Sequence, residues 1–376
     1  MDAEGKSFDF IVVGGGMAGT AAAAHLSRRG RVALLERETQ AGYHSTGRSA
    51  ALFSTIYGNA AVRALTRASQ DFLFESPAWF TPTPLVSPRS TLFFATPTQM
   101  AVLAAFRDDA DIAASTRCLD VAEASELVPA FKPGYLGGAV LEPGSADIDV
   151  DALHQGYLRQ ARAAGAAVVL DGEVTRVERK GGRWEVEARG ARYDAPVVVN
   201  AAGAWADEVA RLAGARPVGL RPLRRTAMLV DAPRGLACAG WPAAIAIDES
   251  FYFKPDGGRL LLSPADEEPS PPCDAQPEDL EVAIAVDRFE TATGERVAKV
   301  WHRWAGLRVF SADRTPVVGF DPAAEGFFWL VGQGGYGIQC AEALARLTAA
   351  LACREPVPAD LAAAGVDAEH LSRSRF

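Results

Sequence analysis

The stretch that most constrains the fold lies near the start of the chain, in residues 8–38, FDFIVVGGGMAGTAAAAHLSRRGRVALLERE. Residues 8–13 form an apolar run typical of a buried strand. The pattern Gly14-x-Gly16-x-x-Gly19 then turns the chain into an alanine-rich helix. Glycine lets the backbone approach a pyrophosphate at the positive end of a helix. The pattern therefore predicts a dinucleotide-binding turn.

A second strand completes this unit. Residues 31–35 form another apolar run, which closes with Glu36. An acidic side chain at the tip of that strand can bind the hydroxyl groups of a ribose. Strand, helix and strand in this order make a βαβ unit, which predicts a parallel sheet and an α/β fold.

Two later segments repeat the change from strand to helix. In residues 197–210, VVVNAAGAWADEVA, the turn is Ala201-Ala202-Gly203, and residues 326–352 contain a glycine-rich turn. Either turn alone could be an ordinary connection between a strand and a helix. Nicotinamide enzymes seldom need three such turns, whereas three turns from distant segments can surround an extended FAD. We therefore expect FAD, with the last helix directed at its flavin ring.

Length and charge limit the classes of protein that fit this chain. It has 376 residues, of which 49% are hydrophobic and 23% charged, and this composition allows two sizeable cores. Two domains are therefore expected. The formal net charge is -9 and no block of lysine or arginine is present, so neither nucleic acid nor an anionic membrane is expected as a partner.

Cysteine usage and hydropathy bear on the cellular compartment. The 5 cysteines are scattered and never form a C-x-x-C pair, so neither a disulfide framework nor a metal site is indicated. The acidic amino terminus enters a strand-like run after a few residues, which leaves no room for a secretory leader. No apolar run approaches the length of a membrane span. We expect a cytoplasmic protein with no transmembrane segment.

Longer motifs are distributed along nearly the whole chain. They are LERETQAGYHSTGRSAA (35–51), SADIDVDALHQGYLR (145–159), VNAAGAW (199–205), DESFYFKPD (248–256), WAGLR (304–308) and EGFFWLVGQGGYGIQ (325–339). Through these motifs the chain resembles the FAD-dependent D-amino acid oxidase superfamily, and within it the bacterial D-arginine dehydrogenases. The resemblance implies a flavoprotein that carries out the oxidative deamination of D-amino acids.

The resemblance also implies two domains. A discontinuous FAD-binding domain, Rossmann-like with three layers, would comprise residues 1–85, 145–215 and 300–376. Residues 86–144 and 216–299 would form an α+β substrate-binding domain on an antiparallel-rich sheet. The segment ESFYFKPDGGRLLLSP favours this division independently, because two β-rich runs around Asp-Gly-Gly are typical of a hairpin.

The family's FAD contacts map onto small, hydroxyl-bearing and charged residues at the three turns and their flanks. Those residues are Gly14, Gly16, Ala18, Gly19, Glu36, Arg37, Ser45, Thr46, Gly47, Arg48, Ser49, Ala50, Ala51, Leu52, Val174, Ala202, Gly203, Gln333, Gly334, Gly335, Tyr336, Gly337 and Ile338. Some relatives attach FAD covalently through a histidine. Because YHSTG around His44 follows the D-arginine dehydrogenase pattern, non-covalent FAD is expected here.

A single arginine in the apolar run GLRVF raises a separate question. A buried cation such as Arg308 is costly unless something pairs with it, and a structural ion pair is one explanation. The resemblance gives another, in which the guanidinium fixes the substrate carboxylate. It assigns supporting roles to Arg225 and Tyr252, although the neighbouring Arg224 is an alternative to Arg225 as a surface or ion-pair residue.

The remaining expected site residues concern the substrate amine and the pocket walls. By resemblance the Gly335 carbonyl accepts a hydrogen bond from the amine, and Tyr57 helps to close the pocket. Leu52 stands where D-arginine dehydrogenases have a histidine, and Thr91 stands where they have the glutamate that binds the guanidinium of D-arginine. The acids considered as replacements, Glu75 and Asp108, do not fall on that position.

These departures predict a preference for apolar or aromatic D-amino acids over basic ones. Phe53 and the pair Ala243 and Ala244 are expected to keep the region around the substrate side chain apolar. A substrate with a cationic side chain would lose about 2 to 5 kcal/mol of binding free energy if the carboxylate that pairs with this side chain is absent.

Other functions stay open at this point. The superfamily includes oxidases of N-methyl amino acids of the sarcosine type, and a nicotinamide-dependent dehydrogenase or a non-catalytic protein with a flavin fold are further alternatives. The electron acceptor, oxygen or a quinone-like carrier, is not indicated by any spacing of residues.

Overall fold

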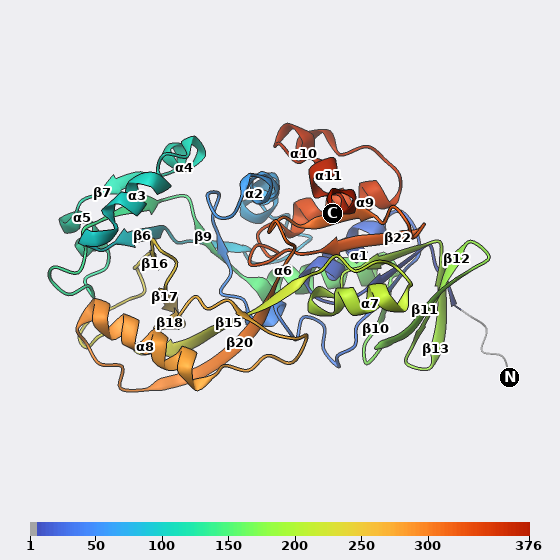
Figure 1. The fold of residues 1–376 in the computed structure, drawn as a ribbon. Coiled ribbons are helices and arrows are strands. Elements are labelled where there is room, and N and C mark those ends of the chain that lie inside the picture. The colour runs from blue at the N-terminus through green and yellow to red at the C-terminus, as the bar shows by residue number, and fades with distance from the viewer. Residues whose placement is uncertain (1–5) are drawn as a thin grey trace.

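The computed structural model describes residues 6–376, which form two parts placed side by side (Figure 1). The centre of one part is a six-stranded sheet with strand order β10-β3-β2-β14-β22-β21. Five of its strands are parallel, and β21 pairs antiparallel with β22. In sheet order the strands are β10 (Ala167–Val169), β3 (Val32–Leu35), β2 (Phe10–Val13), β14 (Val197–Asn200), β22 (Phe327–Val331) and β21 (Val317–Phe320).

The strands of this sheet are apolar on both sides, so both of its faces must be buried. Helices cover one of the two faces. Ala21, Ala22, Ala23 and Ala24 of α1 are fully buried, so α6 and α9 can approach it closely. The helices of this layer and its surroundings are α1 (Met17–Leu26), α2 (Ala60–Phe74), α6 (Val150–Ala163), α7 (Ala206–Leu212), α9 (Ala341–Ala352), α10 (Ala359–Ala363) and α11 (Ala368–Leu371).

A four-stranded sheet, in the order β1-β13-β12-β11, packs on the opposite face. Trp184 and Val186 of this sheet share a core with Ile11 and Phe327 of the six-stranded sheet. The strands are β1 (Lys6–Ser7), β11 (Val174–Lys180), β12 (Arg183–Ala188) and β13 (Ala191–Ala195). Helices, a central sheet and this second sheet make three layers, so the predicted Rossmann-like, three-layer α/β fold is confirmed.

The other part of the molecule is built on a nine-stranded sheet, which is antiparallel except between β6 and β16. Its strands are β6 (Thr91–Ala95), β7 (Arg117–Leu119), β8 (Gly138–Glu142), β15 (Arg221–Val230), β16 (Ala243–Ala246), β17 (Tyr252–Asp256), β18 (Arg259–Ser263), β19 (Glu268–Pro269) and β20 (Val300–Phe310). The helices beside it are α3 (Met100–Phe106), α4 (Ala110–Ser115), α5 (Val121–Leu127) and α8 (Asp279–Thr293). The predicted hairpin is present, since β17 and β18 pair through Asp256 and Arg259 around Gly257 and Gly258.

One strand differs from the segmentation expected from the sequence. The sequence places residues 300–310 with the FAD-binding segments, whereas in the structure β20 pairs with β15 over almost its whole length, in the nine-stranded sheet. At its far end, Val309 bridges to Gly334 after β22. The strand therefore joins the two parts of the molecule, while the division into two domains stays a prediction.

Short elements complete the described chain. A three-stranded sheet, in the order β4-β9-β5, lies between the two larger parts. The elements are β4 (Leu52–Phe53), β5 (Val86–Pro88), β9 (Ala146–Ile148) and the 3-10 turns η1 (Thr46–Arg48), η2 (Pro97–Gln99), η3 (Gly203–Trp205) and η4 (Arg373–Arg375). No helix in residues 6–376 is long and apolar enough to cross a membrane.

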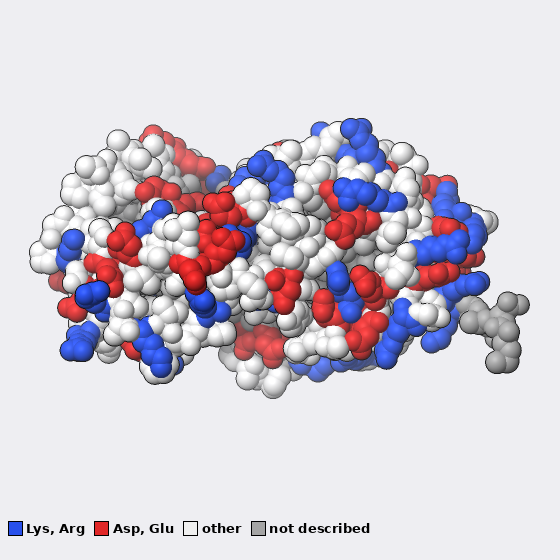
Figure 2. Space-filling view, turned by 60° about the horizontal axis from the view of Figure 1, so that its bottom comes forward, with Lys and Arg blue, Asp and Glu red and all other residues white. Residues whose placement is uncertain are grey.

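Charged side chains of both signs are interspersed over the face drawn in Figure 2. Several ion pairs lie on the four-stranded sheet, where Arg176 lies near Glu178 and Glu187. Such exposed pairs contribute little to stability.

Candidate FAD and substrate site

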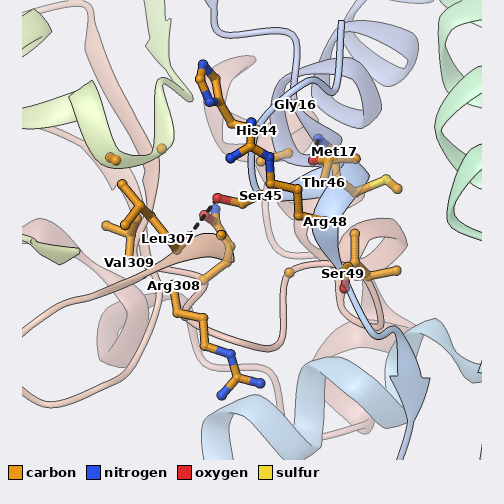
Figure 3. A pocket seen from close by; sticks show the side chains of 18 of the residues that line it. Gly16, Met17, His44, Ser45, Thr46, Arg48, Ser49, Leu307, Arg308 and Val309 are labelled. Atoms are coloured by element: carbon orange, nitrogen blue, oxygen red, sulfur yellow. Dashed lines mark hydrogen bonds between the residues drawn. The ribbon is translucent and has the colours of Figure 1, made fainter. Parts of the chain in front are cut away.

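A long cleft begins at the carboxyl ends of β2, β3 and β14 and continues to the nine-stranded sheet. Its walls come from segments far apart in sequence, including Gly14, Thr46, Tyr252, Arg308 and Gly335. Ligands of open parallel sheets bind at this edge, because the helices that follow the strands begin there. Figure 3 shows the region where the 44–49 segment faces the end of β20.

The glycine turn after β2 has no space for side chains. Gly14 has a φ of +106°, and a Cβ there would lie 2.4 Å from the carbonyl oxygen of Ala201. A Cβ on Gly19 would lie 1.8 Å from the carbonyl oxygen of Gly14. Gly19 therefore allows α1 to pack against the turn and does not itself line the cleft. The Glu36 carboxylate orders the same region by accepting from the Gly15 amide at 2.6 Å.

The segment after β3 joins the glycine turn to β20. The Thr46 hydroxyl accepts a hydrogen bond from the Met17 amide at 2.9 Å. The Ser45 hydroxyl donates to the Leu307 carbonyl at 2.6 Å, and the Arg308 side chain points away from this bond (Figure 3). Arg48 donates to the carbonyl of Ala305 at 3.0 Å and thus holds the two parts of the molecule together.

The last glycine turn lies directly against β20. The Gly334 amide donates to the Val309 carbonyl at 2.8 Å. Gly334 has a φ of +55°, and a Cβ there would lie 2.2 Å from the Phe310 ring. A Cβ on Gly335 would lie 2.7 Å from Cζ of Arg308. Glycine is thus required at 334 for the turn to meet β20, whereas a Cβ at 335 would displace the flexible end of the Arg308 side chain.

Most of the cofactor residues predicted from the sequence line this one cleft. Three do not. Gly19 packs under the turn, the Gly47 amide donates to the Gly42 carbonyl at 2.8 Å, and the ring of Tyr336 packs edge-on against Tyr57 with centroids 4.8 Å apart. Each of the three supports a residue of the wall. Cleft residues that the sequence did not single out include Met17, Gly172, Trp205 and Leu212.

The shape and chemistry of the cleft fit FAD. Its turns are closed to side chains, α1 begins at Met17 beside the first turn, and hydroxyl groups of Ser45 and Thr46 lie along one wall. His44 is engaged by Glu38, whose Oε1 is 2.9 Å from its Nε2. The residues present would therefore hold the nucleotide at the six-stranded sheet and the flavin toward β20.

Arg308 lies at the far end of the cleft and is half-buried there. Among residues 6–376 no carboxylate lies within ion-pair distance of its guanidinium, so the structural ion-pair explanation fails. Its NH1 donates to the Tyr57 hydroxyl at 3.1 Å. Burial by itself lowers the pKa of Arg308, but the neighbouring phenol groups of Tyr57 and Tyr252 outweigh it and raise the pKa above its ordinary value. A half-buried cation without an anionic partner is suited to bind an anionic ligand.

The structure distinguishes the two adjacent arginines of β15. Arg225 lines the cleft, donates from Nε to the Asp266 carbonyl at 2.7 Å and pairs through NH2 with Oε1 of Glu267 at 3.3 Å. Its pKa is lowered by burial and then by the positive charge of Arg308, which places the two cations near each other. Arg224 points elsewhere and forms an ion pair with Glu278.

The walls near Arg308 are largely apolar. They include Leu52 and Thr91, as predicted, together with Phe93, Ala227, Ile245, Tyr252 and Ala265. The expectation for Phe53, Ala243 and Ala244 was wrong, since none of them lines the cleft. Phe53 packs edge-on against Phe74 with centroids 5.1 Å apart, and alternation along β16 turns Ala244 into the core while Ile245 faces the cleft.

An acid other than Glu75 and Asp108 lies beside Thr91. Thr91 of β6 pairs directly with Glu142 of β8, which is 1% exposed. The Thr91 hydroxyl lies 2.8 Å from that of Ser145, which donates to the Glu142 carbonyl at 3.0 Å. Glu142 itself does not line the cleft. At the rim, Glu249 does line it and is exposed.

Comparison with known proteins identifies the family. Residues 9–351 match the family model described as DAO, FAD dependent oxidoreductase. The chain belongs to this family. The DAO family protein is therefore an FAD-dependent oxidoreductase, and the prediction of FAD is confirmed, while its non-covalent attachment stays a prediction.

Individual relatives of this DAO family protein are more distant. Glycine oxidase of Geobacillus kaustophilus is 27% identical over 94% of this chain and 95% of its own length. The crystal structure of that glycine oxidase superposes with a TM-score of 0.83 at 23% identity and covers 99% of both chains. L-proline dehydrogenase from P. horikoshii also has a TM-score of 0.83, at 20% identity, over 99% of this chain and 98% of its own. These structural matches show the shared fold. The finer resemblance to D-arginine dehydrogenases stays a prediction.

Proposed function

We propose that this DAO family protein catalyses the oxidative deamination of D-amino acids with apolar or aromatic side chains. The observation that carries the proposal is Arg308, a half-buried guanidinium without a carboxylate partner, placed in the FAD cleft beside Gly335. A substrate carboxylate would neutralise it and accept two parallel hydrogen bonds, which fixes direction as well as position.

The other residues of this end would complete the orientation of the substrate. Arg225 adds a second guanidinium, which is also paired with Glu267 at 3.3 Å. Tyr252 lies on the cleft side of β17, while Phe251 and Phe253 pack in the core. The Gly335 carbonyl would accept a hydrogen bond from the substrate amine. When the carboxylate and the amine are both held, the Cα–H bond is fixed in a single orientation. Orientation of this kind is the basis of the rate enhancement.

The reaction needs no protein base if the amine binds in its neutral form. Bound FAD supplies the acceptor for the hydride that leaves Cα. The nitrogen lone pair then forms the C=N bond of an imino acid, and water converts this product to a 2-oxo acid and ammonia. The protein's residues orient the substrate and exclude water. Oxygen or a quinone-like carrier would take the electrons from the reduced enzyme.

The preferred side chain follows from the walls around it. Phe93, Ile245 and Ala227 present apolar surface, and the Thr91 hydroxyl is already engaged with Ser145. Glu249 is exposed at the rim, so water screens its charge. A D-arginine side chain would therefore find no desolvated carboxylate in the cleft, and we expect it to be a poor substrate.

A second candidate is the oxidation of glycine or secondary amino acids. It is favoured by the similarity to glycine oxidase over nearly the whole chain and by a fold shared with iminodiacetate oxidase from Chelativorans sp. BNC1, with a TM-score of 0.77. Arg308 would serve equally well for any of these carboxylates, so the two candidates differ in the amine and the side chain.

The experiment that separates them is steady-state reduction of an artificial dye by one preparation of the flavoprotein. The substrates are D-phenylalanine, D-leucine, D-arginine, glycine, N-methylglycine and L-proline. We expect the highest kcat/KM for D-phenylalanine or D-leucine. A higher value for glycine, N-methylglycine or L-proline would establish the second candidate, and dye reduction by none of them would support a non-catalytic role.

A further inference from the structure

Glu142, the last residue of β8, is a buried carboxylate without a positive partner among residues 6–376. Its Oε2 accepts from the Ser54 hydroxyl at 2.7 Å, and its Oε1 accepts from the Thr55 amide at 2.8 Å and from the Thr55 hydroxyl at 3.0 Å. Burial raises the pKa of this carboxyl group, although the hydrogen bonds oppose that shift. Burying a carboxylate costs stability, and Glu142 forms no ion pair that would offset this cost, so its presence needs another explanation.

All three donors belong to the short segment that leads to Tyr57. The same segment is held from its other side by Gln339, whose Oε1 accepts from the Ser54 amide at 3.1 Å. Gln339 also donates from Nε2 to the Thr66 hydroxyl at 2.8 Å. Residues 54–55 are thus fixed between β8 and the turn that precedes α9.

Tyr57 follows directly and is the residue that contacts Arg308. Its hydroxyl accepts the Arg308 hydrogen bond at 3.1 Å, and its ring packs against Tyr336. At Gly58 the φ is +86°, and Asn59 caps α2 by accepting from the Val62 amide at 3.1 Å. The chain between the Glu142 contacts and this cap is short, so the position of the Tyr57 ring depends on both ends.

We propose that Glu142 is a positioning residue for the substrate carboxylate, because it fixes the 54–56 segment and through it the Tyr57 hydroxyl that orients Arg308. This inference rests on the proposed role of Arg308. It adds a residue from β8, on the nine-stranded sheet, that touches neither substrate nor cofactor.

A double-mutant cycle tests the coupling. Glu142→Ala should raise KM for D-phenylalanine on the order of tenfold with a smaller effect on kcat, and in a Tyr57→Phe background the same change should have less than about a third of that effect. Thr55→Val removes one donor while keeping its shape, and it should show a smaller increase in KM that also disappears in the Tyr57→Phe background. Thr55→Val replaces Glu142→Ala as the test variant if Glu142→Ala does not fold.

Asp321 provides a matched control. It is a buried carboxylate that accepts from the indole of Trp329 at 2.9 Å and from the amides of Ala323 and Ala324, and it lies near the amino end of β22, away from the cleft. Asp321→Ala should lower the melting temperature and leave KM unchanged. Effects of Glu142→Ala and Tyr57→Phe that simply multiply would overturn the proposal, since residues that act independently do not couple.

Binding of benzoate, followed by the change in flavin absorbance, separates this proposal from the proposed function. Benzoate probes the carboxylate site without turnover. Weaker benzoate binding in Glu142→Ala, abolished in the Tyr57→Phe background, supports the positioning role whichever amine is oxidised. Unchanged benzoate affinity in Glu142→Ala contradicts that role even if D-amino acids prove to be the substrates.

Discussion

Gly335 and Arg308 are so close that a Cβ on the glycine would lie 2.7 Å from Cζ of the guanidinium and 2.9 Å from its NH2. The turn that approaches the flavin position and the strand that carries the half-buried cation are therefore fitted to each other without space for a methyl group. Because the guanidinium is the far end of a flexible side chain, it would move before the backbone does.

Gly335→Ala should therefore impair the substrate site while leaving the fold intact. We expect a lower kcat/KM for D-leucine, on the order of a hundredfold, because the guanidinium is displaced from the carboxylate. The flavin content and the melting temperature should change little. A variant that keeps full activity would show that Arg308 does not need its present position.

Arg308→Met tests the same cation directly. We expect FAD to stay bound and kcat/KM to fall on the order of a hundredfold or more, because a charged contact to the carboxylate is lost. Arg224→Met is the control, since Arg224 is paired with Glu278 outside the cleft. It should retain kcat/KM even if stability falls. Loss of flavin and precipitation of Arg308→Met alone would instead indicate a structural role.

Thr91→Glu tests which substrate side chains the site accepts, and the structure shows that this substitution needs a second, compensating one. A glutamate at this position would stand directly across from the buried Glu142, and like charges on paired residues of neighbouring strands are destabilising. We expect Thr91→Glu alone to be unstable or inactive. The double variant Thr91→Glu with Glu142→Gln should gain activity on D-arginine, measured as kcat/KM relative to D-leucine, whereas Glu142→Gln alone should not. Equal D-arginine activity in all three would show that the side chain binds elsewhere.

The buried carboxyl group of Glu142 also predicts a dependence of stability on pH. Burial raises its pKa above 4.5, so its charged form costs stability at neutral and alkaline pH, and this cost is relieved as the pH falls through the raised value. Glu142→Gln removes the charge. Its melting temperature relative to the wild type should therefore be more favourable at pH 8 than at pH 5. An advantage that grows toward acid would contradict a raised pKa.

The features that could be predicted from the sequence are those whose residues lie close together along the chain. The glycine turn, the second strand and Glu36 lie within one short segment, so their pattern predicts their structure. The importance of Arg308 could also be recognised, because a cation among apolar residues of a strand is unusual wherever the strand lies.

Features that depend on contacts between distant segments could not be read in this way. The pairing of Thr91 with Glu142 depends on the register of β6 with β8, and a shift of one residue reverses the face of every side chain. The same uncertainty made Ala243 and Ala244, rather than Ile245, the expected wall residues. The position of β20 beside β15 likewise follows from long-range strand pairing, which has no local signature.

Anaerobic reduction of the flavin in a stopped-flow instrument tests most directly whether a D-amino acid is oxidised at Cα. The comparison uses D-phenylalanine, its Cα-deuterated form and L-phenylalanine with wild type and Arg308→Met. We expect D-phenylalanine to bleach the wild-type flavin rapidly, deuterium at Cα to slow the bleaching, and both the L-enantiomer and Arg308→Met to be far slower. Bleaching by the L-enantiomer at an equal or higher rate, or no bleaching by any D-amino acid, would contradict the proposed function.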